Sequence, residues 1–230
     1  MQLCKELDIL FESDTIKPTF THVHVFLSLL IFDENQNGIG RYRLKEELLI
    51  GSGTSRSLIE KLKNKIKFID VIREDGTKSN RRSGHVLTKK GMDFLKKFKK
   101  KIPFLILGDL DVLKDIIIES EKNFSTICLV KNGSDKMRYG VEQRDAAIMA
   151  AGSGATCLVF DGENLNFPIP SSNQEKNEKE SVNEKVQDYL IDIVSKTGSN
   201  LEKGDVIIIG LGSDPKKSRL ASLSSALTLL

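Results

Sequence analysis

The stretch IGSGTSRSLIEKLKN, residues 50–64, holds a set of side chains suited to binding an anion. Its polar members at the start are Ser52, Thr54, Ser55, Arg56 and Ser57. Hydroxyl groups and the unpaired N–H groups of a first helical turn bind phosphate oxygens, and an arginine can donate two parallel hydrogen bonds to guanine O6 and N7. The stretch therefore indicates either a loop that holds a small-molecule phosphate or a turn that directs a helix at a larger polyanion.

The residues after the two glycines predict a helix over about 54–66, with Thr54 at the N-cap. Its apolar positions, which fall within one arc of a helical wheel, are Leu58, Ile59, Leu62 and Ile66. Arg56 and Lys61 fall outside this arc, where a partner can reach them. Ser55 falls near its edge, so the pattern leaves open whether Ser55 packs, caps the helix or contacts a partner.

The formal net charge of +3 hides a strong segregation of charge along the chain. Residues 41–101 hold 19 Lys and Arg against 7 Asp and Glu, residues 1–40 hold 2 against 6, and residues 102–230 hold 14 against 19. Because one segment holds the whole positive excess, we expect that segment to bind a polyanion. The alternative is a lysine-rich surface that only keeps the protein in solution.

The order of elements in the first half narrows the fold. Apolar spacing and turn residues predict a helix at 19–32, a short extended run at 39–44, a helix at 45–50, the helix at 54–66, a hairpin of strands at 67–75 and 85–88, and a basic helix at 88–102. The hairpin tip is loaded with basic residues. This is the element order of a winged helix-turn-helix domain.

Residues 19–101 resemble the winged-helix DNA-binding domains of prokaryotic transcription regulators. The segment HVLTKKGMDFL, residues 85–95, resembles the second wing strand running into the closing helix. A winged helix followed by an acidic α/β domain is similar to an archaeal group of such regulators whose C-terminal domain is poorly characterised. One departure is NKIKFIDVI, residues 64–72, where these domains often have a glycine before the first wing strand.

The resemblance implies that double-stranded DNA is the partner. The helix at 54–66 would enter the major groove, and a basic wing at 74–83 would lie along the backbone or reach a minor groove. The residues expected to contact DNA are Ser52, Thr54, Ser55, Arg56, Ser57, Lys61, Lys78, Arg81 and Arg82. Winged helices also occur as protein-interaction modules and in RNA-processing assemblies, so the fold alone does not establish control of transcription.

The second half alternates apolar runs with helical patterns, which predicts an α/β domain with a mixed sheet. The expected elements include a helix from Leu110 to Glu121, strands in FSTICLVKN and ATCLVFDGENLNF, and a helix closed by Gly198. We therefore expect a DNA-binding domain at 1–101 and an effector-binding or dimerisation domain at 102–230, with a mobile loop at 171–182.

Two further motifs in the second half resemble binding sites. In GLGSDP, a strand, Gly210-x-Gly212 and a helix start have the geometry of an anion site, but the third glycine of a dinucleotide fingerprint is missing. Asp214 also places a negative charge where a phosphate would lie, so we expect it to cap the helix. Near a second helix start, the candidates for a small-molecule effector are Arg138, Glu142, Arg144 and Asp145, and a local ion-pair network is the alternative.

The remaining residues argue against several classes of function. Three cysteines and three histidines show no zinc-like spacing, and no Ser-His-Asp or Cys-His arrangement is legible. We expect no metal, no cofactor, no catalysis and no membrane partner, in a cytoplasmic protein. A homodimer is expected from operator symmetry and from the apolar face of the last helix, which can equally be core. The alternatives are an enzyme or nucleotide-binding protein acting through residues 102–230, and a protein–protein adaptor.

Overall fold

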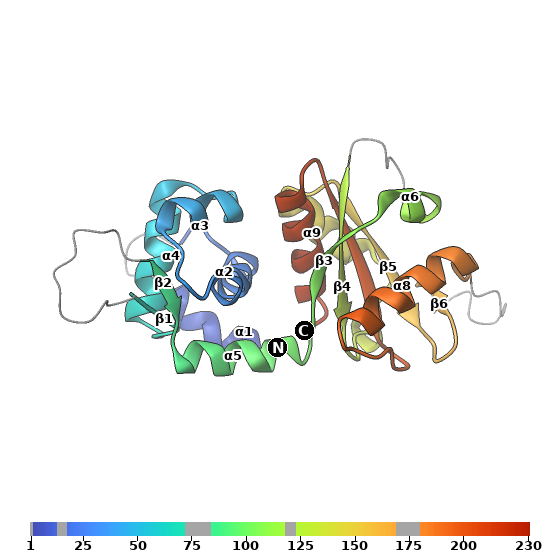
Figure 1. The fold of residues 1–230 in the computed structure, drawn as a ribbon, viewed down its shortest axis with the longest axis horizontal. Helices are drawn as coiled ribbons and strands as arrows, with labels where there is room; N and C mark the ends of the chain where they lie inside the picture. The colour runs from blue at the N-terminus through green and yellow to red at the C-terminus, as the bar shows by residue number, and fades with distance from the viewer. Residues whose placement is uncertain (1, 13–17, 72–83, 118–122, 169–179) are drawn as a thin grey trace. The chain divides into compact units, whose positions relative to one another are not determined.

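A computed structural model describes residues 2–12, 18–71, 84–117, 123–168 and 180–230 of the chain. It divides into two compact units, Met1–Phe98, called unit 1, and Lys99–Leu230, called unit 2 (Figure 1). The fold is a mixture of helices and antiparallel sheets, and each unit is described by itself.

Unit 1 packs its helices around a cluster of aromatic rings. Its helices are α1 (Gln2–Leu7), η1 (Asp8–Leu10), α2 (His22–Glu34), α3 (Arg41–Leu48), α4 (Ser52–Asn64) and α5 (Lys89–Lys99), and its strands are β1 (Ile69–Val71) and β2 (His85–Leu87). Phe26 of α2 stacks on Phe98 of α5 with ring centroids 4.5 Å apart, and Phe68 lies 4.8 Å from Phe94. Helix α2, which is buried on nearly all sides, and the apolar face of α5 therefore share a core.

The turn before α4 differs from the sequence prediction. The helix begins at Ser52, with Gly51 at the N-cap in an extended conformation, so Thr54 is inside the helix and does not cap it. The left-handed residue of the turn is Leu49, with φ 54°, whereas neither Gly51 nor Gly53 has a positive φ. The sharp turn is therefore made by a leucine.

The predicted extended run at 39–44 is also wrong in part. Only Ile39 pairs there, through an isolated antiparallel bridge with His85, and α3 already begins at Arg41. Leu44 and Leu48 are buried, which places them at helical spacing against the core. The apolar face extends from the predicted helix at 45–50 toward the N-terminus. Burial against the core therefore makes α3 begin earlier than its local sequence predicts.

Unit 2 is built on one five-stranded sheet. Its strands are β3 (Leu105–Gly108), β4 (Phe124–Val130), β5 (Gly154–Phe160), β6 (Leu165–Asn166) and β7 (Val206–Gly212), in the spatial order β3-β4-β7-β5-β6. Its helices are α6 (Leu110–Leu113), η2 (Lys114–Ile116), η4 (Ser134–Lys136), α7 (Val141–Met149), α8 (Glu184–Lys196) and α9 (Pro215–Leu227). Figure 1 shows α8 on one face of the sheet and α9 on the other.

Every pairing between neighbouring strands of this sheet is antiparallel, so the predicted mixed sheet is wrong. The strands β4 and β5, joined through α7, do run parallel to each other, as the alternating pattern predicts. The last strand, β7, lies between them and pairs antiparallel with both. The strand–helix–strand pattern in the sequence predicts that β4 and β5 are parallel, but it cannot show that β7, which comes later in the chain, lies between them.

The contact between α9 and β7 is made possible by small residues. A Cβ on Gly210 would collide with the backbone of Ser222, and a Cβ on Gly212 would collide with the backbone of Ser218. Both glycines lie within β7, so they do not form a loop between the strand and the helix start. Their lack of a side chain lets helix and strand backbones approach closely.

The apolar face of α9 is core. Leu220 and Leu223 are buried, and Leu227 and Leu230 are partly buried. The structure thus decides between the two readings of this face that the sequence left open. The face predicted for dimerisation is used inside unit 2.

Two other predictions for unit 2 need correction. Of the helix expected over Leu110–Glu121, residues 118–121 lie outside the described residues; the described part is the short α6 followed by η2, and Ile117 is extended and buried. Of the loop expected at 171–182, residues 171–179 lie outside the described residues. At its end, the N–H of Val182 donates to the carbonyl of Leu165 at 3.1 Å. Burial of Ile117 and Val182 therefore fixes segments whose local sequence pointed elsewhere.

Candidate functional site

The start of α4 is an exposed helix N-terminus. Gly51, Ser52 and Gly53 are exposed, and no side chain caps the helix. The first backbone bond of the helix runs from the N–H of Ser55 to the carbonyl of Gly51, at 2.9 Å. The N–H groups of the first turn have no acceptor within their own helix, and the helix dipole adds partial positive charge there. This geometry suits a phosphate oxygen.

The two hydroxyls that follow are engaged within unit 1. Thr54 Oγ1 lies 2.6 Å from Thr19 Oγ1, which fastens α4 to the segment before α2. Ser55 is fully buried and its hydroxyl donates to the carbonyl of Arg41 at 3.3 Å. Ser55 therefore faces the core and holds α4 against α3, which settles the orientation that the sequence left open.

Arg56 and Ser57 remain on the surface of α4. The exposed guanidinium of Arg56 donates to the carboxylate of Glu60, one turn later, at 3.0 Å. An exposed ion pair of this kind contributes at most about 1 kcal/mol. Arg56 can therefore exchange Glu60 for another acceptor at small cost.

Lys61 contacts the N-terminal segment of unit 1. Its ammonium donates to the carbonyls of Leu10 and Glu12, at 2.7 and 2.9 Å. Burial lowers the pKa of Lys61, with the neighbouring charge of Lys65 acting in the same direction. The lysine holds the N-terminal segment against α4, a role with no local sequence signal because its acceptors lie about fifty residues away.

Arg41 and Tyr42 form a further candidate contact that was not predicted from the sequence. Tyr42, at the start of α3, is 56% exposed, and the guanidinium of Arg41 lies 5.1 Å from its ring centroid. An exposed aromatic ring beside an arginine is a common surface for stacking and for phosphate contacts. Arg-Tyr-Arg at 41–43 is the signal that could have revealed them.

The wing residues Lys78, Arg81 and Arg82 lie outside the described residues. The strands that flank them are described: β1 and β2 pair antiparallel, with Val71 opposite His85. The pKa of His85 is lowered, chiefly by burial and then by the charge of Lys63. The base of the hairpin is therefore a defined, partly apolar structure.

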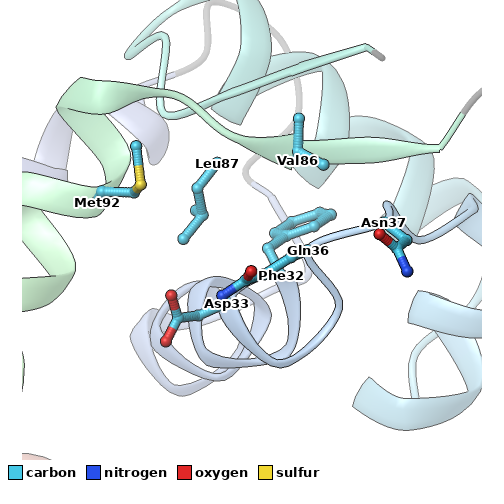
Figure 2. Close-up of a pocket in the computed structure, with 7 residues that line it drawn as sticks. All are labelled: Phe32, Asp33, Gln36, Asn37, Val86, Leu87 and Met92. Atoms are coloured by element: carbon cyan, nitrogen blue, oxygen red, sulfur yellow. The ribbon is translucent and has the colours of Figure 1, made fainter.

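A hollow of about 680 Å³ lies in unit 1 at the C-terminal end of α2 (Figure 2). Its lining residues are Phe32, Asp33, Gln36, Asn37, Val86, Leu87 and Met92. Among the described residues that line it, the carboxylate of Asp33 is the one charged side chain, and a helix C-terminus is the negative end of the dipole. The hollow is therefore suited to a neutral or cationic group, and it does not suit a phosphate.

In unit 2, the predicted effector residues lie on and before α7. Arg138, Glu142, Arg144 and Asp145 are all exposed. Arg144 donates to Asp145 Oδ1 through both Nε and Nη2, at 3.1 and 2.9 Å, as expected for a local ion pair. Effector binding by these four residues stays a prediction.

The start of α9 is closed by its own carboxylate. Asp214 Oδ1 accepts from the N–H groups of Lys216 and Lys217, each at 3.0 Å, and Pro215 occupies the first turn. The prediction that Asp214 caps this helix is confirmed. The N–H groups that an anion would need are already bonded.

Two of the three cysteines, Cys128 and Cys157, are buried. Burial raises the pKa of Cys128 and of Cys157 to about 12, which keeps both thiols protonated. The described residues contain no group of three or more side chains that could hold a metal ion. Among the described helices, none has the length and apolar character needed to cross a membrane.

Comparisons with known proteins concern the fold. Residues 122–229 match a family described as a domain of unknown function (DUF4443). The hypothetical protein PH0730 from Pyrococcus horikoshii OT3 is similar in structure, with 22% sequence identity and a TM-score of 0.59, over 91% of this chain and 93% of that chain. A comparison with curated proteins found no match. At this identity the likeness to PH0730 shows a shared fold across both units and carries no function.

Proposed function

We propose that the protein is a sequence-specific DNA-binding transcription regulator. In this proposal unit 1 is a winged helix, α4 enters the major groove, and the hairpin of β1 and β2 is the wing. Unit 2 serves dimerisation, effector binding or both. The order of three helices, a hairpin and a closing helix supports the winged-helix reading.

The observation that carries the proposal is the coincidence of charge and an open helix start. The segment with 19 Lys and Arg against 7 Asp and Glu contains α4, whose N-terminus is exposed and free of a side-chain cap. A helix of this width fits the major groove, and its first turn approaches base edges and phosphates. The positive charge of this segment by itself would give only non-specific binding to DNA, through the release of counterions.

The contacts divide into two kinds. Phosphates would be held by Ser52 and the first-turn N–H groups, and by the wing residues Lys78, Arg81 and Arg82. Arg56 and Ser57 would face base edges, with Arg56 donating to guanine. Thr54, Ser55 and Lys61 are left out of the proposed direct contacts, because all three are engaged within unit 1.

Fluorescence anisotropy of a labelled mixed-sequence duplex, titrated with the full chain at low salt, tests the proposal. Arg56→Ala should weaken binding to the duplex sequences that the wild type prefers by about tenfold or more. The double variant Arg81→Ala, Arg82→Ala should weaken binding to all duplexes and make the affinity depend less steeply on salt concentration. Lys196→Ala, on α8 of unit 2, is the matched control and should bind as wild type.

Two outcomes would redirect the proposal. If wild-type protein prefers a single-stranded or structured RNA competitor over duplex DNA, the partner is RNA. If no nucleic acid binds, the alternative is an enzyme or a small-molecule-binding protein that acts through residues 102–230. That alternative is tested by looking for a metabolite or nucleotide released when the purified protein is denatured.

A further inference from the structure

The two edges of the unit 2 sheet are different. At the β6 edge the chain returns as residues 180–182: the N–H of Phe167 donates to the carbonyl of Glu180 at 2.9 Å, and Ser181 donates to Asn166 Oδ1 at 2.7 Å. At the other edge, β3 pairs with β4 on one side only, within the described part of the chain. An edge strand leaves alternate N–H and C=O groups directed outward.

The β3 edge is short, but within the strand it has no charged residue and no proline to prevent pairing. Its sequence is Leu-Ile-Leu-Gly, with no charge and no proline inside the strand, and Leu107 is 59% exposed. Natural edge strands commonly carry lysine, proline or a bulge that prevents another strand from adding. An uncharged, exposed edge is therefore a surface for strand addition.

The apolar side chains beside this edge lie on the α9 face of the sheet. Leu107 is directly opposite Thr126, whose hydroxyl bonds to Ser218 of α9 at 2.8 Å, so both side chains share that face. Phe124, two residues before Thr126 on β4, lies on the same face and is 46% exposed. Leu107 and Phe124 also line one hollow of about 300 Å³. A neighbour that extends the sheet would cover this strip.

We propose that β3 pairs antiparallel with β3 of a second copy of this chain, which extends the sheet from five strands to ten. The twofold axis is perpendicular to the sheet and keeps its two faces continuous. An odd-numbered residue of one strand can therefore oppose only an odd-numbered residue of the partner, and an even-numbered residue only an even-numbered one. A register centred on Ile106 pairs Leu105–Leu107 of each strand. Leu105 then opposes the partner's Leu107 on the α9 face.

The charges that flank β3 favour this occupant and this direction. Lys100 and Lys101 precede the strand, Asp109 and Asp111 follow it, and all four are exposed. An antiparallel pair brings the basic end of one strand beside the acidic end of the other, twice by symmetry. In the register centred on Ile106, Lys101 and the partner's Asp111 are each five residues along the chain from the axis, beyond the ends of the paired strands. A parallel strand would place like charges together, which is unfavourable.

Sedimentation velocity of the full chain without DNA tests the proposal, over about 1 to 100 µM because a short strand pair buries less than a standard interface. Wild type should shift from monomer to dimer across this range. Leu107→Lys should weaken association by about tenfold or more. Met149→Lys is the matched control, since Met149 is 89% exposed on α7 and its loss should leave association unchanged.

A charge exchange tests the register. Lys101→Glu should weaken association severalfold, and adding Asp111→Lys should restore it. Hydrogen exchange of the wild-type chain supplies a readout that needs no variant: within Leu105–Leu107, the amides directed away from β4 should gain protection as protein concentration rises. A wild type that stays monomeric at about 100 µM, or a Leu107→Lys protein that dimerises like wild type, would overturn the proposal. Because no DNA is present, failure here leaves the DNA-binding proposal standing, and the reverse also holds.

Discussion

Two of the Gly-x-Gly sequences near helix starts, Gly51-x-Gly53 and Gly210-x-Gly212, are used by the structure in opposite ways. Around Gly51 and Gly53 there is open space: a Cβ on Gly53 would meet nothing within 4 Å, and α4 starts without a side-chain cap. Gly210 and Gly212 lie inside β7 against the backbone of α9, whose N-terminus is capped by Asp214. One pair leaves a helix start accessible, and the other closes a core.

The difference shows how to read a short glycine motif. The same letters suit an anion site when the helix N–H groups are free, and close packing when a second backbone lies against the glycines. The deciding features are the cap and the neighbour. The capping residue can be seen in the sequence, whereas the neighbour is known only from the fold.

The largest expected effect comes from filling the buried motif. Gly210→Ala should lower the free energy of unfolding of unit 2 by about 3 kcal/mol, because its Cβ would collide with the backbone of Ser222, which cannot give way as a side chain can. Urea unfolding followed by hydrogen exchange on each unit measures this. A loss below about 1 kcal/mol would contradict the close packing of α9 on β7.

Removing the cap of α9 should have a smaller effect. Asp214→Ala should lower the stability of unit 2 by about 1 kcal/mol, since the N–H groups of Lys216 and Lys217 lose their acceptor. Asp214→Ser, which keeps an acceptor, should recover most of the loss in the same unfolding measurement. If Ser and Ala variants were equally destabilised, the carboxylate would act through charge and not as a cap.

At the accessible motif the sign of the effect should reverse. Gly53→Ala should raise the stability of unit 1 by about 0.5 kcal/mol, because the new methyl meets no neighbour and alanine restricts the unfolded chain more than glycine does. Denaturant unfolding of wild type and variant measures the shift. Destabilisation would show that Gly53 is needed by the fold, and the contrast with Gly210 would fail.

The last prediction concerns the pH dependence of stability, which should differ between the two units. All three histidines lie in unit 1, and burial lowers the pKa of His24 and His85 below the ordinary 6.5. Unfolded histidines bind protons first as pH falls, so below pH 6.5 unit 1 should lose stability until the folded pKa values are reached. For His85, Lys63 adds to this lowering, whereas Asp70 and the hydrogen bond with Ile39 oppose it.

Hydrogen exchange of each unit at pH 7.5 and 5.5 supplies the measurement. Unit 2 provides the internal comparison, since it has no histidine. His85→Gln should reduce the pH dependence of unit 1. An unchanged dependence in that variant would assign the effect to other groups.

Much of each fold could be predicted from local patterns. The helical spacing of Val186, Leu190 and Ile193 predicts the buried face of α8, and Asp214 followed by Pro215 predicts the start of α9. These signals are readable because periodicity and capping depend on residues close together in sequence. Strand placement is not local, which is why the position of β7 between β4 and β5 was missed.

The candidate site divides in the same way. The sequence identified the segment 52–57 and the basic charge around it, and it correctly placed Arg56 on the exposed face of α4. It could not decide Ser55, because a residue at the edge of the apolar arc is buried only if another helix, here α3, lies against it. It also missed the use of Lys61, whose acceptors belong to a segment far away along the chain.

The sequence by itself determined where charge gathers, which faces of the helices are apolar and how α9 begins, since each depends on composition, spacing or a single capping residue. The tertiary structure decided which glycines are covered, which polar side chains near α4 are free, and which strand of unit 2 remains an edge. These depend on the packing of distant segments, where burial selects among arrangements that local interactions leave nearly equal in free energy.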